Sequence, residues 1–201
     1  MKELMSTVAE ALSRRGFTVH HAATKEEAAQ LTLSLIPSGA SVGVGGSMTI
    51  RELGLAEALQ SAGHAVHWHW LGQGPAAFPA AREADVYLAS ANAITRDGLI
   101  INIDGTGNRV ASMIHGPKQV VVVVGVNKLV DGGYAQAVAR IKREACPPNA
   151  KRLGLGTPCG VTGKCDPLSC DGGMCNVITV QEHPTGRRPY HVVLVDEMLG
   201  Y

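Results

Sequence analysis

Apolar residues recur along the chain at two spacings, one typical of helices and the other of strands. Leu4, Val8 and Leu12 fall on one face of a helix expected over residues 1–15. Short apolar runs and further helical stretches follow in turn. In chain order they predict a strand over 17–21, a helix over 24–35, a strand over 41–44, a helix over 49–62, a strand over 65–70, a short helix over 79–83 and a strand over 86–90.

The second half of the chain continues this alternation. Arg96-Asp97-Gly98 is a turn signal between Ile94 and the apolar run 99–103. Five consecutive valines, 120–124, predict a strand buried on both faces. The remaining expected elements are helices over 108–115 and 134–145, an irregular stretch after Pro147-Pro148, and strands over 176–182 and 191–195 that alternate like an antiparallel pair.

Strands and helices that alternate in this way predict an α/β fold, with a largely parallel sheet flanked by helices and joined by right-handed crossovers. The chain has 201 residues, of which 45% are hydrophobic and 17% charged, so it can bury a sizeable core. We expect one α/β domain over residues 1–201, which carries a cysteine-rich segment at 157–176 and the small antiparallel pair near its end.

Charge and composition exclude several classes of partner. The net charge is +1 with scattered basic residues, and aromatic residues make up 4% of the chain, so neither a basic patch nor a base-stacking platform for nucleic acid is expected. The longest strongly apolar run, 120–124, is far shorter than the ~20 residues of a membrane span. The first residues lack the apolar core of a secretion signal, so we expect a cytoplasmic protein.

Two glycine-rich loops each leave a strand and enter a helix. The first is Gly45-Gly46-Ser47-Met48-Thr49, and the second is Asp104-Gly105-Thr106-Gly107-Asn108. Free backbone N–H groups at such helix starts favour an anion, and loops at the carboxyl ends of parallel strands converge on one crevice. Taken alone, either loop is equally well explained as a tight connection. The substrate-binding candidates are Gly45, Gly46, Ser47, Thr49, Gly105, Thr106, Gly107, Asn108 and, after the valine strand, Asn127 and Lys128.

Charged residues near these loops supply candidates for catalysis and recognition. Glu52 lies one turn into the helix after the first loop and is a candidate general base, although an ordinary first-turn glutamate explains it as well. Asp97 is a second candidate base, although its position in the turn Arg96-Asp97-Gly98 is enough to explain the residue. Arg109 and Arg51 are candidates for a bidentate pair with a carboxylate or phosphate. His67 and His69 share one strand face, where decoration of an edge strand is favoured over a metal pair.

Four cysteines, Cys159, Cys165, Cys170 and Cys175, lie within seventeen residues. In a reducing compartment this crowding favours metal ligation over disulfides. No Cys-x-x-Cys knuckle of a structural zinc site is present, so the spacing favours an iron–sulfur cluster, with zinc or four unligated thiols as alternatives. Cys146 stands apart and is expected to be a core residue at a helix end.

The order of these motifs resembles the lactate-utilization (LUD) domain family over essentially the whole chain. The resemblance rests on Gly45-Gly46-Ser47-x-Thr49, Ala84-Asp85, Thr95-x-Asp97-Gly98, 102–106, 124–130, 148–152, the cysteine segment and the ending 197–201. It implies a fold similar to the sugar-phosphate isomerase and CoA-transferase superfamily, and it adds Asn102 to the substrate-binding candidates. In the family pattern the third cysteine falls where Leu168 stands, whereas this chain has Cys170.

The resemblance implies a role in lactate oxidation beside iron–sulfur partner subunits. The first hypothesis is an enzyme or redox subunit in which a cluster, expected to be [4Fe–4S], lies beside a crevice for a small carboxylate or phosphorylated ligand. The second is a non-catalytic ligand-binding or assembly protein with a structural zinc site. The third is an isomerase or transferase that uses Glu52 or Asp97 without a cluster. A homo-oligomer is compatible with all three.

Overall fold

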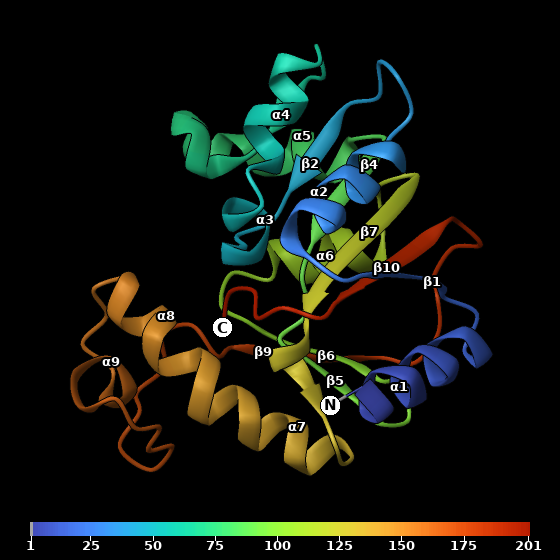
Figure 1. Ribbon diagram of the computed structural model, residues 1–201. Helices are drawn as coiled ribbons and strands as arrows, with labels where there is room; N and C mark the ends of the chain where they lie inside the picture. Colours follow the sequence, from blue (N-terminus) through green and yellow to red (C-terminus); the bar gives the residue numbers. More distant parts are fainter. Residues whose placement is uncertain (1) are drawn as a thin grey trace.

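The computed structural model describes residues 2–201 (Figure 1). Within that range the strands form two sheets. The larger sheet is parallel throughout, in the order β1 (Thr18–Ala22), β10 (Tyr190–Val195), β7 (Gln119–Gly125), β4 (Val86–Ala89), β2 (Val42–Val44) and β3 (Val66–His67). The smaller, mixed sheet has the order β8 (Leu129–Val130), β5 (Ala93–Thr95), β6 (Ile100–Asp104) and β9 (Val177–Gln181). The predicted α/β fold with a largely parallel sheet is confirmed.

Helices cover both faces of the large sheet. The first core contains Val121 and Val123, and the second, on the opposite face, contains Val120, Val122 and Val124, so the valine strand is buried on both sides as predicted. The helices on the first face are α2 (Lys25–Ser34), α3 (Met48–Glu52) and α4 (Leu55–Ser61); those on the second are α1 (Lys2–Arg14), α5 (Ala77–Glu83) and α6 (Asn108–Ile114). None of the helices within residues 2–201 combines the length and the hydropathy that a membrane crossing requires.

The last two strands do not pair with each other, which corrects the expected antiparallel pair. Strand β10 enters the large sheet between β1 and β7, parallel to both, and five of its six residues are buried. Strand β9 pairs antiparallel with β6 and forms an edge of the small sheet, where Val177, Ile178 and Val180 stay exposed. The alternation in the sequence identified both strands but carried no information on their partners.

Two predicted elements are shorter than expected. The helix over 49–62 is divided into α3 and α4 at Gly54, whose positive φ of 61° interrupts the helical backbone. The strand over 65–70 is reduced to the two residues of β3, after which residues 69–76 form tight turns with Gly72 at a φ of 79°. This irregular connection leads the chain around one end of the first glycine loop.

The region after Pro147-Pro148 is helical, contrary to the expectation of an irregular stretch. Helix α7 (Tyr134–Arg140) passes through a π-helical turn at Ile141–Ala145 into α8 (Cys146–Arg152), and α9 (Pro158–Thr162) follows. The prolines occupy the first turn of α8, where a missing N–H breaks no helical hydrogen bond. In Figure 1 this long helix runs along the small sheet and delivers the cysteine-rich segment to one end of it.

Strand β2 and helix α5 meet backbone to backbone at Gly43, where an added Cβ would overlap the Ala81 carbonyl. We expect Gly43→Ala to destabilise the protein by about 1–3 kcal/mol in urea unfolding, because neither backbone can move without disturbing the sheet. Gly156→Ala is the matched control: its Cβ meets no atom within 4 Å, and the expected change is within about 0.5 kcal/mol. Equal effects of the two substitutions would contradict this packing.

Candidate functional site

A crevice of about 510 Å³ lies at the carboxyl ends of the parallel strands, between the two sheets. The structure brings both glycine loops to this crevice, as the sequence predicted. Residues 46–48 follow β2, 90–92 follow β4 and Lys128 follows β7, all strands of the parallel sheet. Asp104 ends β6 of the small sheet, and 105–106 follow it. The remaining wall comes from α8 and from residues 173–176, so the crevice is shared by the α/β core and the cysteine-bearing part of the chain.

The first glycine loop is held tightly against its surroundings. Ser47 caps helix α3 by accepting a hydrogen bond from the backbone N–H of Ile50 at 3.3 Å. A Cβ at Gly45 would lie 2.9 Å from both Arg109 Cγ and Tyr87 Oη, so only glycine lets the loop approach these side chains. Both readings of this loop therefore apply, because it is a capped strand–helix connection and it also lines the crevice.

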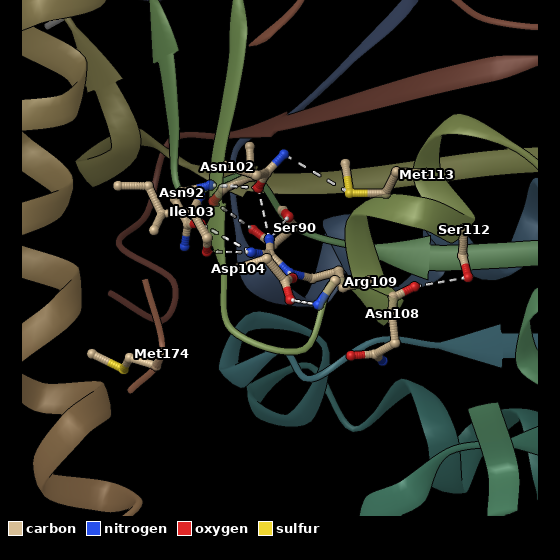
Figure 2. A network of polar contacts seen from close by, with 12 residues as sticks. Ser90, Asn92, Asn102, Ile103, Asp104, Asn108, Arg109, Ser112, Met113 and Met174 are labelled. Carbon is tan, nitrogen blue, oxygen red and sulfur yellow. Dashed lines mark hydrogen bonds and ion pairs between the residues drawn. The ribbon is translucent and has the colours of Figure 1, made fainter. Parts of the chain in front are cut away.

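The Arg109 guanidinium holds the second glycine loop in place through a network of hydrogen bonds (Figure 2). Its Nε donates to Asp104 Oδ2 at 3.0 Å, and its Nη1 donates to Asn102 Oδ1 at 2.6 Å and to the Ser90 carbonyl at 3.1 Å. Its Nη2 donates to Asn92 Oδ1 and to the Ile103 carbonyl, both at 3.0 Å.

These five hydrogen bonds use all five N–H donors of the Arg109 guanidinium. The side chain is only 10% exposed, and Asp104, its ion-pair partner, is 8% exposed. Arg109 therefore has no free donor for a ligand, which corrects the expected bidentate role. Its function in the fold is to position 90–92 and 102–104 around one point, and Asn102 belongs to this support rather than to the lining.

Lys128 is a second buried cation at the crevice, beside Arg109. It is 3% exposed, and its Nζ donates to Thr49 Oγ1 at 2.8 Å and to Ser90 Oγ at 3.1 Å. Both hydroxyls have their own hydrogen directed at backbone carbonyls, of Leu199 and Ala91 respectively. Within residues 2–201, no carboxylate forms an ion pair with Lys128. A protonated Lys128 has a third N–H that these two hydroxyls leave unused.

Burial lowers the pKa of Lys128 to about 7, and the nearby positive charges of Arg140 and Arg109 lower it further, against a smaller opposing effect of Glu52. An ammonium in such a place is stabilised by a bound anion. Since Lys128 lines the crevice, an anionic ligand placed there would supply the missing countercharge.

The two predicted catalytic carboxylates do not line the crevice. Glu52 Oε2 accepts a hydrogen bond from the Gly200 N–H at 2.8 Å. Asp97 lies in the turn between β5 and β6, where it accepts from Thr95 Oγ1 at 2.6 Å and pairs with Arg15 at 3.2 Å. Both carboxylates hold local structure, and neither is among the residues that line the crevice.

The structure places the other candidates in two groups. Asn127 is hydrogen-bonded to the last residues of the chain and so lies behind the crevice. Its Oδ1 accepts from the Leu199 N–H at 3.1 Å, and its Nδ2 donates to the Gly200 carbonyl at 3.2 Å. Predicted residues that line the crevice are Gly46, Ser47, Gly105, Thr106, Asn108 and Lys128. Predicted residues that are absent from the described lining and support it are Gly45, Thr49, Asn102, Gly107 and Asn127.

Several lining residues were missed by the sequence reasoning. Asn92 follows strand β4 at its carboxyl end, a position that could have marked it. His69 and Trp70 form an aromatic wall, and the Arg152 guanidinium lies 4.8 Å from the centre of the Trp70 ring. Histidine 67 does sit on an edge strand, β3, as predicted, whereas His69 lies beyond the strand and in the wall. Arg152 could not have been found, because it depends on the helical course after Pro147.

Two of the five cysteines, Cys146 and Cys175, line the crevice on its α8 side. Cys146, buried at the start of α8 as expected of a core residue, has its Sγ 3.5 Å from Cys175 Sγ, and both residues line the crevice. The Cys146 thiol and the ammonium of Lys142 stabilise a thiolate at Cys175 and lower its pKa. Burial raises the pKa of Cys165, and Cys159, Cys175 and Cys170 raise it further by their charge, although Lys142 opposes them.

The remaining thiols are less closely joined. Cys159 is buried and lies 3.4 Å from Thr157 Oγ1, while Cys170 Sγ lies 3.9 Å from the Gly172 carbonyl. In the described part of the chain, no three His, Cys, Asp or Glu side chains converge closely enough to hold a metal ion together. Among the described residues, the thiol–thiol contact is the one between Cys146 and Cys175, and the four cysteines predicted as ligands do not meet at one point.

The comparisons with known proteins agree with this architecture. The family model described as the LUD domain matches residues 5–195. A DUF162 family protein from Deinococcus radiodurans has a similar structure, with a TM-score of 0.57 and 15% sequence identity over 96% of this chain and 97% of that one. No curated protein matches the chain significantly. Because the family model spans nearly the full sequence, the chain belongs to the LUD-domain family.

Proposed function

We propose that this protein binds a small carboxylate in the crevice and acts in lactate-type metabolism as a redox protein. The observation that carries the proposal is Lys128, a buried ammonium that faces the crevice with two hydroxyl acceptors and without an ion-pair partner among residues 2–201. Burying such a charge is costly unless a ligand neutralises it. A carboxylate placed against Lys128 would also lie between the two glycine loops.

The residues around Lys128 have different roles in the proposed binding of a carboxylate. Thr49 and Ser90 fix the direction of the Nζ, and Arg109 holds the second glycine loop and 90–92 in place. Asn108 and Ser47 offer polar groups at the lining that suit a hydroxyl or carbonyl next to the carboxylate. A 2-hydroxy or 2-oxo acid has this pair of groups. An isomerase or transferase that uses Glu52 or Asp97 has less support, because neither carboxylate lines the crevice.

The cysteine-rich segment supports the metal-bearing part of the proposal through its donor chemistry. Five thiols lie between residues 146 and 175, and no histidine occurs in that stretch. Thiolates without imidazole neighbours select soft metals, namely iron in clusters or zinc. Cys159, Cys165, Cys170 and Cys175 would hold an iron–sulfur cluster, whose chemistry is the transfer of single electrons. Iron–sulfur partner subunits would be the source or acceptor of those electrons.

Purification of the full chain without oxygen tests this part directly. We expect bound iron and acid-labile sulfide in comparable amounts, with broad absorbance near ~400 nm from sulfur-to-iron charge transfer that disappears in air. The measurement is iron, zinc and sulfide analysis of the same sample. Zinc without iron or sulfide, in protein kept strictly anaerobic and offered ferrous iron and sulfide, would contradict the iron–sulfur proposal and favour the structural zinc alternative.

A further inference from the structure

We infer that the crevice takes a dianionic acid, with one carboxylate at Lys128 and a second anionic group, a carboxylate or a phosphate, at Arg152. The inference rests on the proposed carboxylate site and names the class of its ligand. Lys128 follows β7 of the parallel sheet, whereas Arg152 ends α8, and both residues line the crevice. The two cations therefore come from the two parts of the chain that share the crevice.

The charged side chains of the crevice lining do not balance. The lining contains one carboxylate, Asp104, and three basic side chains, those of Arg109, Lys128 and Arg152. Asp104 and Arg109 form an ion pair at 3.0 Å, so their charges cancel. Within residues 2–201, no carboxylate forms an ion pair with Lys128 or with Arg152. A ligand that complements this lining carries two negative charges.

Other titratable groups of the lining leave this balance unchanged. Burial and the charge of Arg152 lower the pKa of His69, so its imidazole is neutral near pH 7. The thiolate favoured at Cys175 has its own countercharge in Lys142, which hydrogen-bonds to it from outside the lining. Neither group supplies a countercharge to Lys128 or to Arg152.

The Arg152 side chain is held in one position. Its guanidinium carbon lies 4.8 Å from the centre of the Trp70 ring. Its Nε and Nη2 both donate to Asn149 Oδ1, at 3.2 and 2.7 Å. Asn149 is fixed in turn, because its Nδ2 donates to Met174 Sδ at 3.2 Å. A planar guanidinium that is already ordered loses little conformational entropy when an anion binds.

Arg152 keeps donors for a ligand, in contrast to Arg109. Asn149 occupies the edge of the guanidinium formed by Nε and Nη2. The edge formed by Nη1 and Nη2 has no hydrogen-bond acceptor among residues 2–201, and the residue is exposed. Two parallel N–H groups on this edge match two oxygens of a carboxylate or a phosphate. Arg152 is therefore suited to a bidentate contact, the role that the sequence suggested for Arg109.

One continuous surface of the crevice joins the two cations. Lys128 Nζ donates to Thr49 Oγ1 at 2.8 Å, and Thr49 belongs to the helix that the first glycine loop enters. In that loop, a Cβ added at Gly46 would lie 3.5 Å from Trp70 Cζ2, so the loop is in contact with the ring on which Arg152 stacks. A ligand that lies along the first glycine loop thus has a cation near each end.

The size of the crevice also favours a ligand longer than lactate. Its volume of about 510 Å³ is in the range of about 300–1,000 Å³ that is typical of sites for drug-sized ligands. A short monocarboxylate at Lys128 would fill a small part of this space and leave the Arg152 edge uncovered. A longer acid with a second anionic group would occupy both.

Isothermal titration calorimetry of the full chain at pH 6.5, with probes that differ by one anionic group, tests the inference. The first pair is 2-hydroxyglutarate and 2-hydroxypentanoate, and the second is 3-phosphoglycerate and glycerate. We expect the dianion of at least one pair to bind about tenfold more tightly than its monoanion, through one charge-assisted contact at an exposed arginine. The pair with the larger preference identifies the second group as a carboxylate or a phosphate.

Arg152→Met should abolish this preference and leave the affinity for the monoanions unchanged. Arg143→Met is the matched control, because Arg143 lies one π-helical turn before α8, is 69% exposed and does not line the crevice. This control should keep the preference of the wild type. Wild-type protein that prefers neither dianion, or a preference that Arg152→Met retains, would overturn the inference.

The same titrations on Lys128→Met separate this inference from the proposed function. Monoanions whose binding needs Lys128, together with dianions that bind no more tightly, would overturn the inference alone and leave the carboxylate site in place. Dianions that bind through Arg152 equally well with and without Lys128 would overturn both, because the ligand would not reach the proposed anchor. Absence of binding for all four probes would also overturn both.

Discussion

Lys128→Met is expected to weaken the binding of lactate or pyruvate about 10- to 100-fold, the equivalent of the ~1.5–3 kcal/mol that a hydrogen bond to a charged group contributes. Methionine keeps most of the apolar stem of lysine and removes the ammonium, so the crevice keeps its shape and loses its cation. Isothermal titration calorimetry at pH 6.5 measures the two affinities. At this pH Lys128, whose pKa is lowered to about 7, is mostly protonated.

Lys118→Met is the matched control for this substitution. Lys118 precedes strand β7 and Lys128 follows it, so the two side chains lie at opposite ends of the same strand, and Lys118 is 80% exposed in its pair with Asp85. The control removes the same charge and should leave the affinity unchanged. Lys128→Met should also be as stable as the wild type or more stable, because it removes a buried charge without an ion-pair partner. Equal carboxylate affinity in wild type and Lys128→Met would refute the anchoring role.

The lowered pKa of Lys128 predicts two opposite dependences on pH. Carboxylate binding requires the ammonium, so affinity should fall as pH rises above about 7, at most about tenfold per pH unit. Stability without ligand should change the other way. Between about pH 7 and the ordinary pKa of 10.5, the unfolded chain binds one proton more at Lys128 than the folded chain does. Over that range this group therefore adds up to about 1.4 kcal/mol per pH unit to the free energy of unfolding.

Urea unfolding at several pH values checks the stability part of this prediction. The wild type should gain stability relative to Lys128→Met as pH rises from 7 towards 10, and the difference between the two proteins should be constant below pH 6, where Lys128 is charged in both states. A difference that does not depend on pH would show that Lys128 keeps its ordinary pKa in the folded protein.

The sequence predicted the crevice better than it predicted the residues that act in it. The first glycine loop and Lys128 follow strands of the parallel sheet, whose carboxyl ends meet at one edge, so their convergence could be expected from the alternation of elements. The second loop follows β6, which pairs antiparallel with β5 and β9 in the small sheet, so its place in the crevice could not be expected on the same ground. The role of Arg109 could not be expected from the sequence. Its donors are used up by Asn92, Asn102 and Asp104, which depend on the pairing of β5 with β6 and on the approach of β4.

The parts that sequence reasoning missed all depend on long-range pairing or on helix continuity. The apolar run 192–195 of β10 is buried on both faces, but its own residues do not encode that its neighbours are β1 and β7. Pro147-Pro148 indicated a break, whereas the π-helical turn before them lets the helix continue and brings Cys146 to Cys175. A pair separated by 29 positions could be recognised only after that helix was placed.

Arg109→Met is expected to produce the largest loss of stability of any substitution considered for this protein, about 3–5 kcal/mol. The substitution leaves Asp104 as a buried carboxylate without its ion-pair partner and removes hydrogen bonds from two buried backbone carbonyls, of Ser90 and Ile103. Arg109→Lys should recover only part of this loss, because lysine keeps the charge but offers three donors from one point in place of five from a planar fork. Urea unfolding with equal m-values measures both.

Arg152→Met provides the control for removing an arginine from the same crevice. Arg152 stacks on Trp70 and bonds to the side chain of Asn149 at an exposed position, so its loss should cost no more than about 1 kcal/mol. If Arg109→Met cost no more than this, the guanidinium would not be the support of the second glycine loop. If Arg109→Met cost the expected amount of stability but Arg109→Lys bound carboxylates as tightly as the wild type, Arg109 would be needed for stability and not for carboxylate binding. We expect the lysine variant to bind more weakly, because residues 90–92 and 104–106, which line the crevice, are positioned by the lost bonds.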